Sequence, residues 1–194
     1  MKPVLKTLIQ STAIAAGLLA GGVAAADGSA AIGAATFNDQ GELLLPDGFR
    51  EWVFIGAPLT PHGLNNGKAG FPEYHHVYVN PDAFAVYQRT GTFPDGTVIA
   101  KELVLLQKGD FKDGSKKAPS GRGYFAGEFQ GMDVMVKDST RFKATNGWGF
   151  FNFGHHAPPY IESAKAASAD SCASCHSANA GKGMVFKTYY PVLR

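Results

Sequence analysis

The residues best suited to chemistry lie near the C-terminus, in the run Cys172-Ala173-Ser174-Cys175-His176. These are the only two cysteines among the 194 residues of the chain. Two thiols at this spacing can bond the two vinyl groups along one porphyrin edge, and the adjacent imidazole can turn to meet the iron. The spacing predicts one covalent c-type haem held by Cys172 and Cys175, with His176 as the proximal ligand of the iron.

Three other roles for the cysteine pair fit the sequence less well. A thioredoxin-type redox pair would sit early in the chain, at the start of a helix within a βαβ unit. A structural zinc site would need about two further ligands at matching spacing. A plain disulfide would not need His176. Haem attachment is therefore the favoured interpretation.

The ligand on the opposite side of the iron separates an electron carrier from a protein with an open iron site, because a carrier places a Met or His there. Met132 and Met135 lie in an alternating segment that favours a core role, and Met184 lies in the C-terminal segment. The pairs His75-His76 and His155-His156 are further candidates. Adjacent residues on a strand point to opposite faces, so at most one histidine of each pair could reach the haem.

Two charged residues stand in apolar, strand-like segments. Lys101 shares one alternating face with Ile99, Leu103 and Leu105, and such a lysine either reaches water from a strand edge or is held partly desolvated. Desolvation would lower its pKa and make the neutral amine a nucleophile. Glu128 lies among aromatic and small residues and is either a surface acid or a buried general base, with Glu102 as the rival acid.

The N-terminus has the three-part layout of a secretory signal peptide. Lys2 and Lys6 precede an apolar run from residue 8 to 20, and small residues follow before Asp27. We expect cleavage near Ala26, a periplasmic location, and no membrane segment in the mature protein. Cleavage would reduce the 18 Lys and Arg to 16, equal to the 16 Asp and Glu. The mature protein would then be near neutral, which disfavours nucleic acid as a partner.

The remaining sequence predicts a flexible segment over residues 27–36 and one domain over residues 37–194. Strand-sized segments are divided by Gly, Pro and Asn turns, and they cover Arg50 to Ile55, Glu73 to Val79, Thr97 to Leu106, Gly123 to Phe129, Met132 to Lys137 and Gly147 to Phe153. Gln130-Gly131 predicts a hairpin turn between the fourth and fifth of these segments. Short helices are expected over Pro81 to Thr90 and Ile161 to Ala169. The fold class is therefore α+β, a single domain that is mainly antiparallel sheet with a few short helices and binds haem near its C-terminal segment.

Nearly the whole mature chain resembles the cytochrome P-460 family. The matching segments are Gly41 to Pro46, Arg50 to Phe54, Gly67 to Ala69, Phe71 to Glu73, Asp95 to Thr97, Lys101 to Leu103, Gly123 to Phe125, Gly127 to Phe129, Val136 to Ser139, the haem motif and Tyr189 to Leu193.

The resemblance implies an exported homodimer with a five-coordinate c-type haem that oxidises hydroxylamine to nitrous oxide or to products at the level of nitric oxide. In that family a lysine is bonded to the porphyrin itself, and this lysine corresponds to Lys101. The nearby acid of the hairpin corresponds to Glu128, which would accept protons. Hydroxylamine and nitric oxide are the expected small ligands, a c-type cytochrome is the expected electron acceptor, and Phe71 is expected near the distal side of the haem.

Two other functions remain open. A protein resembling cytochrome c′-beta would share the fold and bind nitric oxide or another gas, without a cross-link or turnover. A simple electron carrier would have a six-coordinate iron. A helical-bundle cytochrome c′ also carries its haem motif near the C-terminus, but the strand-rich pattern disfavours it.

Overall fold

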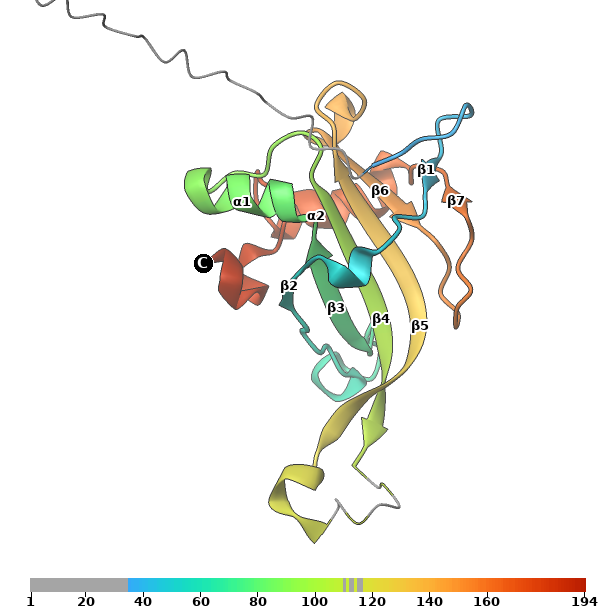
Figure 1. The fold of residues 1–194 in the computed structure, drawn as a ribbon, viewed down its shortest axis with the longest axis vertical. Coiled ribbons are helices and arrows are strands. Elements are labelled where there is room, and N and C mark those ends of the chain that lie inside the picture. The colour runs from blue at the N-terminus through green and yellow to red at the C-terminus, as the bar shows by residue number, and fades with distance from the viewer. Residues whose placement is uncertain (1–34, 110, 112–113, 115–116) are drawn as a thin grey trace, which may run out of the picture.

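The computed structural model describes residues 35–109, 111, 114 and 117–194 (Figure 1). The predicted signal peptide, residues 1–26, and residues 27–34 of the predicted flexible segment lie outside the described residues. Thr36 and Phe37 are already part of the fold, because the Leu44 amide donates to the Thr36 carbonyl and Phe37 forms a β-bridge with Leu43.

The centre of the molecule is a five-stranded antiparallel sheet with the order β2-β3-β4-β5-β6. Its strands are β2 Val53–Gly56, β3 Tyr74–Val79, β4 Val98–Lys108, β5 Tyr124–Lys137 and β6 Trp148–Asn152. A two-stranded sheet pairs β1 Leu43–Leu44 with β7 Ser163–Ala164. The mainly antiparallel, single-domain α+β fold predicted from the sequence is thus confirmed.

The helices are short. The α-helices are α1 Pro81–Thr90 and α2 Ser174–Asn179, and a π-helical turn, η6 Ala169–Ala173, leads into α2. Single 3-10 turns occur at η1 Phe49–Glu51, η2 His62–Leu64, η4 Pro119–Gly121, η5 Lys143–Thr145, η7 Lys187–Tyr189 and η8 Pro191–Leu193. No helix among the described residues is both long enough and apolar enough to cross a membrane.

The helix predicted over Pro81 to Thr90 is confirmed with the same bounds. Pro81 occupies the first turn, where a backbone N–H has no partner within the helix and its absence does not weaken the helix. Gly91 ends the helix in the left-handed conformation at φ 70°. The helix predicted over Ile161 to Ala169 is wrong. Ser163 and Ala164 pair with Leu44 and Leu43, so tertiary pairing outweighs the local helical propensity of this Ala-rich segment.

The hairpin predicted at Gln130-Gly131 is also wrong, because β5 runs through this dipeptide as one long strand. Gly131 pairs with Leu103 and Phe129 pairs with Val104, so Gln130 is the extra residue of a β-bulge. A glycine in a strand marks a bulge as readily as a turn. The real hairpin joins β4 to β5 and extends well beyond the other strands (Figure 1).

The two faces of the large sheet carry different layers. In Figure 1, α1, α2 and the C-terminus lie to one side of the sheet, and β1 and β7 lie to the other. The helical side contains a core formed by Ile55, Val77, Val79, Ile99, Phe150, Met184 and Val185 with their neighbours. The β1/β7 side contains a second core that includes Leu43, Val98, Ala100, Met132, Val134, Phe151 and Phe153.

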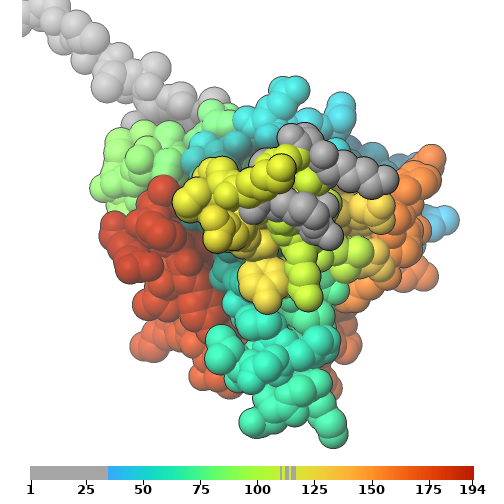
Figure 2. Space-filling model, turned by 90° about the horizontal axis from the view of Figure 1, so that it is seen from below, coloured from blue at the N-terminus to red at the C-terminus, as the bar shows by residue number. Residues whose placement is uncertain are grey.

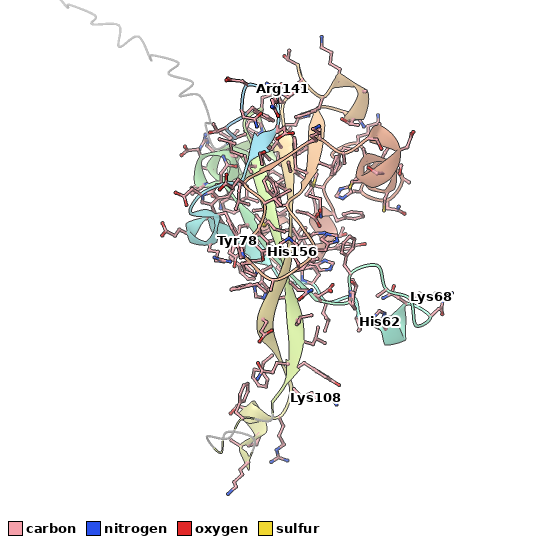
Figure 3. All side chains as sticks on the ribbon, turned by 90° about the vertical axis from the view of Figure 1, so that its right-hand side faces the viewer. His62, Lys68, Tyr78, Lys108, Arg141 and His156 are labelled. Atoms are coloured by element: carbon pink, nitrogen blue, oxygen red, sulfur yellow. The ribbon has the colours of Figure 1, made fainter. Side chains whose placement is uncertain are left out.

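Two peripheral segments, the end of the β4–β5 hairpin and the loop that precedes β3, lie near one end of the sheet. Seen from below, the end of the β4–β5 hairpin faces the viewer, and the C-terminal segment and the loop that precedes β3 appear below it in the view (Figure 2). His62 and Lys68 lie on that loop, which extends to one side of the sheet, and Lys108 marks the far end of β4 (Figure 3). These loops stand at the edge of the helical face, where the candidate site lies.

Candidate functional site

The haem motif begins in the π-helical turn and continues into α2. Cys172 is in the turn, and Cys175 and His176 are in the helix. Ala173, between the two thiols, is buried in the core of the helical side, whereas both cysteines are free and exposed. The motif is thus anchored by its small apolar residue and presents both thiols at the surface, where a porphyrin edge can reach them.

His176 is held in one orientation. Its ring packs edge-on against Phe150 and Phe186, with centroids 4.8 and 4.9 Å away, and its Nδ1 lies 2.7 Å from the Met184 carbonyl oxygen. A carbonyl can only accept, so Nδ1 carries the proton and Nε2 has a free lone pair. Burial lowers the pKa of His176 and favours the neutral imidazole that binds metals.

Met184 supplies that carbonyl from an unusual backbone position. Its φ of 59° lies in the left-handed region, which residues other than glycine rarely adopt, and its side chain is buried. The thioether contacts Asn146 Nδ2 at 3.6 Å on the same side of the sheet. Met184 is therefore a support for His176 and not a partner on the opposite side of an iron.

The residues of the motif fit a haem. Two free exposed thiols stand beside an imidazole whose Nδ1 is bonded to a carbonyl and whose Nε2 is available, the usual arrangement of a metal-binding histidine. Among the residues that the structure describes, no group of three or more His, Cys, Asp and Glu could hold a metal ion by itself. A porphyrin would have to supply the other ligands of the iron.

Lys101 stands in a polar row on the helical face of the sheet. It pairs directly with Asp133 on β5, and Asp133 pairs with Asn152 on β6, so all three side chains share one face. Lys101 Nζ lies 2.9 Å from Asp133 Oδ2, and Asn152 Nδ2 donates to Asp133 Oδ1 at 2.7 Å. The side chains of Lys101 and Asp133 are 24% and 25% exposed, so the ion pair is only partly shielded from water.

Asp133 is the acid next to Lys101, although it is not among the site residues predicted from the sequence. Burial alone would raise the pKa of Asp133, but Lys101, Asn152 and His155 together outweigh burial and hold the pKa below its usual range. A signal was present, because Asp133 is the only charged residue between Met132 and Val136 in an otherwise apolar strand segment. Its partnership with Lys101 depends on strand register, which local sequence does not define.

An aromatic ring covers Lys101. Lys101 Nζ lies 4.0 Å from the centre of the Phe71 ring, within the range of a cation–π contact. His75 and His155 each pack edge-on against Phe71, with centroids 5.9 and 5.5 Å away. Phe71, expected near the distal side of the haem, therefore forms an aromatic cover over Lys101.

The polar row and the haem motif lie on the same face. The row next to Lys101, Asp133 and Asn152 contains Ile99, Met135 and Phe150, and Phe150 is the ring that His176 contacts. The charges of Lys101 and Asp133 both act on the pKa of His176, after the larger effects of burial and of the Met184 carbonyl. The fold thus brings Lys101 and the cysteine–histidine motif together, although they are over 70 residues apart in the chain.

Glu128 lies elsewhere. Its side chain is exposed on the outer part of β5, so the buried environment considered for it is absent. The neighbouring pairs Val104–Phe129 and Leu106–Ala126 place it opposite Leu105, about 13 Å along β4 from Lys101 at the usual rise per residue. The structure does not bring Glu128 to Lys101.

The other candidate ligands are spread over both faces. Met132 is buried on the β1/β7 side, and Met135 packs in the core of the helical side. His76 packs against Phe54 and Tyr74, and His156 packs against Tyr160. Of the two histidine pairs, only His75 and His155 contact Phe71 beside Lys101.

Glu102, the rival acid, points to the opposite face and is fully buried. It accepts hydrogen bonds from Arg50 Nε at 3.0 Å, from Arg50 Nη2 and from the Tyr160 hydroxyl at 2.9 Å. A hollow of about 690 Å³ on this side is lined by Leu45 to Glu51, Pro158 to Tyr160 and Glu162. Neither Lys101 nor the haem motif contributes to that hollow.

The comparisons with known proteins agree with this geometry. No curated protein matches the chain. A family model described as Cytochrome P460 matches residues 46–187, a span that contains Lys101, Asp133 and the whole cysteine–histidine motif. Since this match covers well over half of the 194 residues, the chain belongs to the cytochrome P460 family and is a haem cytochrome.

Proposed function

We propose that this haem cytochrome is an exported, periplasmic enzyme that oxidises hydroxylamine to nitrous oxide or to products at the level of nitric oxide. The observation that carries the proposal is the Lys101–Asp133 pair on the same face as His176. Cys172 and Cys175 would bond the haem, and His176 Nε2 would bind its iron. The bound haem would supply the redox-active iron that takes electrons from the substrate.

Asp133 is the residue that we assign to proton transfer. Oxidation of hydroxylamine releases protons along with electrons, so a base beside the substrate is needed. Asp133 is a carboxylate that Lys101 and Asn152 hold in a fixed position. The sequence predicts this role for Glu128, whose exposed side chain lies about 13 Å along the strand from Lys101 and outside the Lys101–Asp133 pair.

Lys101 would have two effects if its nitrogen bonds the porphyrin. The cross-link would alter the electronic structure of the ring. It would also replace an ammonium group with an uncharged amine, which removes the charge that now lowers the pKa of Asp133. Burial would then act with less opposition and raise that pKa, so Asp133 would become a better proton acceptor.

Phe71 would keep the site dry. Its ring covers Lys101 and is held edge-on between two imidazoles, so it occupies space that water would otherwise fill. Exclusion of water strengthens the electrostatic interactions of Asp133 with its partners. Electrons would pass to an external acceptor, a c-type cytochrome, and we expect the protein to act as a homodimer.

The test compares three proteins in hydroxylamine-dependent reduction of a soluble one-electron acceptor. Asp133→Asn keeps the shape of the side chain but removes the base, so we expect turnover to fall about 100-fold. Glu128→Gln is the matched control and should retain the wild-type rate. A fall in Glu128→Gln with a normal Asp133→Asn would return the role to Glu128, and a wild type without hydroxylamine-dependent reduction would refute the proposed activity.

A second candidate function is a nitric-oxide-binding protein similar to cytochrome c′-beta, without turnover. One observation favours it: Lys101 is engaged with both Asp133 and the Phe71 ring, and a charged ammonium is not a nucleophile. Such a protein would bind nitric oxide at a five-coordinate iron and show the spectrum of an unmodified c-type haem. A six-coordinate spectrum would instead indicate an electron carrier.

A further inference from the structure

The ring of Tyr189 connects the haem motif to the surface through one intervening ring. Phe186 packs edge-on against His176 with the two centroids 4.9 Å apart, and Tyr189 stacks on Phe186 at the same centroid distance. The planes of the Phe186 and Tyr189 rings differ by only 6°. Phe186 is partly buried in the core of the helical side, whereas Tyr189 is 53% exposed. Two ring contacts therefore lead from the predicted iron ligand to solvent.

Exposed apolar side chains continue along the chain after Tyr189. Pro191 and Val192 are exposed in the 3-10 turn η8, and we call Tyr189, Pro191 and Val192 the C-terminal patch. The Tyr87 hydroxyl donates to the Leu193 carbonyl at 2.7 Å, which fixes the backbone of this turn against α1. In Figure 2 the red atoms of the C-terminal segment form one continuous area of the surface. The patch is thus a fixed part of the surface.

The segment that presents the patch carries charge of one sign. Residues 171–194 contain Lys182, Lys187 and Arg194 but no Asp or Glu, although the whole chain has 16 acidic side chains. None of the three cations forms an ion pair with another residue that the structure describes. Lys187 Nζ instead donates to the Gly91 carbonyl at 2.8 Å, at the end of α1. Positive charge therefore accompanies the exposed apolar residues.

These features match the requirements of a transient electron-transfer complex. Such complexes bury little surface, and interfaces combine an apolar centre with a polar rim, while complementary charges steer the encounter. Electron transfer weakens steeply with distance, so a partner must dock where the route from the iron to the surface is short. The C-terminal patch meets this condition through Phe186. Tyr124, which is 62% exposed, lies at the outer end of β5 instead.

We propose that the C-terminal patch is the docking site of the electron acceptor, and that this acceptor is a small c-type cytochrome with acidic residues around its haem edge. The inference rests on the proposed function, which expects a c-type cytochrome in this role. In each encounter the reduced protein loses one electron from its iron and becomes ferric, and the ferric iron of the partner gains that electron. No covalent bond forms or breaks, and no proton moves.

The first experiment mixes the chemically reduced, haem-loaded protein with an acidic ferric cytochrome c in a stopped-flow instrument. No hydroxylamine is present, so the rate constant reports docking and electron transfer alone. We expect Tyr189→Ala to lower the second-order rate constant about 10-fold, because a tyrosine is often a dominant residue of an interface. Tyr124→Ala removes a similarly exposed ring from the hairpin and should keep the wild-type rate. A wild-type rate in Tyr189→Ala would overturn the proposal.

Two further measurements separate docking from support of His176. A small uncharged quinone needs no docking surface, so Tyr189→Ala should transfer one electron to it at the wild-type rate. Tyr189→Phe keeps the stacked ring and should reduce the cytochrome as fast as the wild type does. Equal slowing of Tyr189→Ala with the quinone and the cytochrome, or a Tyr189→Phe as slow as Tyr189→Ala, would show that the patch is not a docking site.

The charge of the segment is tested with Arg194→Glu, and Lys165→Glu is the matched control. Arg194 follows the patch closely in the chain, whereas Lys165 comes directly after β7 and is 85% exposed. Salt screens the attraction between exposed charges, so Arg194→Glu should slow the reaction several-fold at low ionic strength and little at high ionic strength. Lys165→Glu should have no effect. Equal effects of the two variants, or faster reduction of a basic cytochrome c than of the acidic one, would contradict the proposed partner.

The contact can also be mapped without electron transfer. Nitrogen-15 NMR of the labelled ferrous carbon-monoxide complex follows the backbone amides while the ferrous acidic cytochrome is added. We expect shift changes in residues 186–194, with residues 124–129 of the hairpin unaffected. Shift changes confined to other surfaces would overturn the proposal, whereas normal docking by a protein that does not oxidise hydroxylamine would count against the proposed function alone.

Discussion

Lys101 and Glu102 are neighbours on β4, yet their side chains meet two different environments. Glu102 is 0% exposed and is enclosed by Arg50 and Tyr160 on the β1/β7 side. Lys101 is 24% exposed and pairs with Asp133 on the helical side, under Phe71 and beside His155. The two neighbours thus form ion pairs on opposite faces of the sheet, and of these two pairs only Lys101–Asp133 lies on the face of the haem motif.

The difference separates a structural ion pair from a reactive one. The Glu102 carboxylate uses its oxygens on three hydrogen bonds and is fully buried. Asp133 holds comparable bonds but also contacts an exposed imidazole. Contact with an exposed imidazole therefore distinguishes Asp133 from Glu102.

Of the variants that test this comparison, Arg50→Met should lose the most stability. Removal of the guanidinium would leave Glu102 buried without a cation, which typically costs about 3–5 kcal/mol. Urea unfolding of protein in which Lys101 is not bonded to a porphyrin measures the loss. Lys101→Met is the matched variant on the other face and should cost about 1 kcal/mol, because Asp133 remains partly exposed and keeps Asn152. Equal losses in the two variants would contradict the distinction between the faces.

Tyr160→Phe should have an intermediate effect. The substitution removes the hydroxyl that donates to Glu102, and burial with that hydrogen bond raises the pKa of Tyr160 well above its usual value. We expect a loss of about 1–2 kcal/mol in the free energy of unfolding, with hydroxylamine turnover unchanged. A large fall in turnover at normal stability would show that the β1/β7 side takes part in the reaction.

The smallest effect concerns the pH dependence of stability. The pKa of Asp133 is lowered in the folded state, so its ionisation stabilises the fold at neutral pH. That contribution, on the order of 1 kcal/mol, is present above the unfolded pKa and is lost as the pH falls below about 4, through the lowered folded value. Unfolding curves of a Lys101-unmodified sample should show this loss, and Asp133→Asn should remove it. A wild type and an Asp133→Asn variant with parallel pH profiles would refute the ion pair.

Local patterns were sufficient for α1 and for the prediction of a haem. The spacing of Cys172, Cys175 and His176 predicts a haem cytochrome, in agreement with the family match, and Pro81 and Gly91 mark the ends of a helix by backbone geometry that acts within one turn. Such features need no information about the rest of the chain.

Local patterns did not predict strand register or the pairing of residues far apart in the chain. Asp133 became the partner of Lys101 only through the alignment of β4 with β5, which also contains the bulge at Gln130. Arg50 and Glu102 are 52 residues apart, and nothing near either residue identifies the other. Ser163 and Ala164 likewise became a strand because Leu43 and Leu44 were available to pair with them.

The measurement that tests the central claim most directly is the absorption spectrum of the chemically reduced wild type beside that of Lys101→Leu, after export in a host that attaches c-type haem. A lysine–porphyrin bond on the helical face predicts a strongly red-shifted main band in the wild type and an ordinary c-type spectrum in Lys101→Leu. Identical spectra in the two proteins would mean that no bond forms at Lys101, and the assignment of this face to hydroxylamine oxidation would be contradicted.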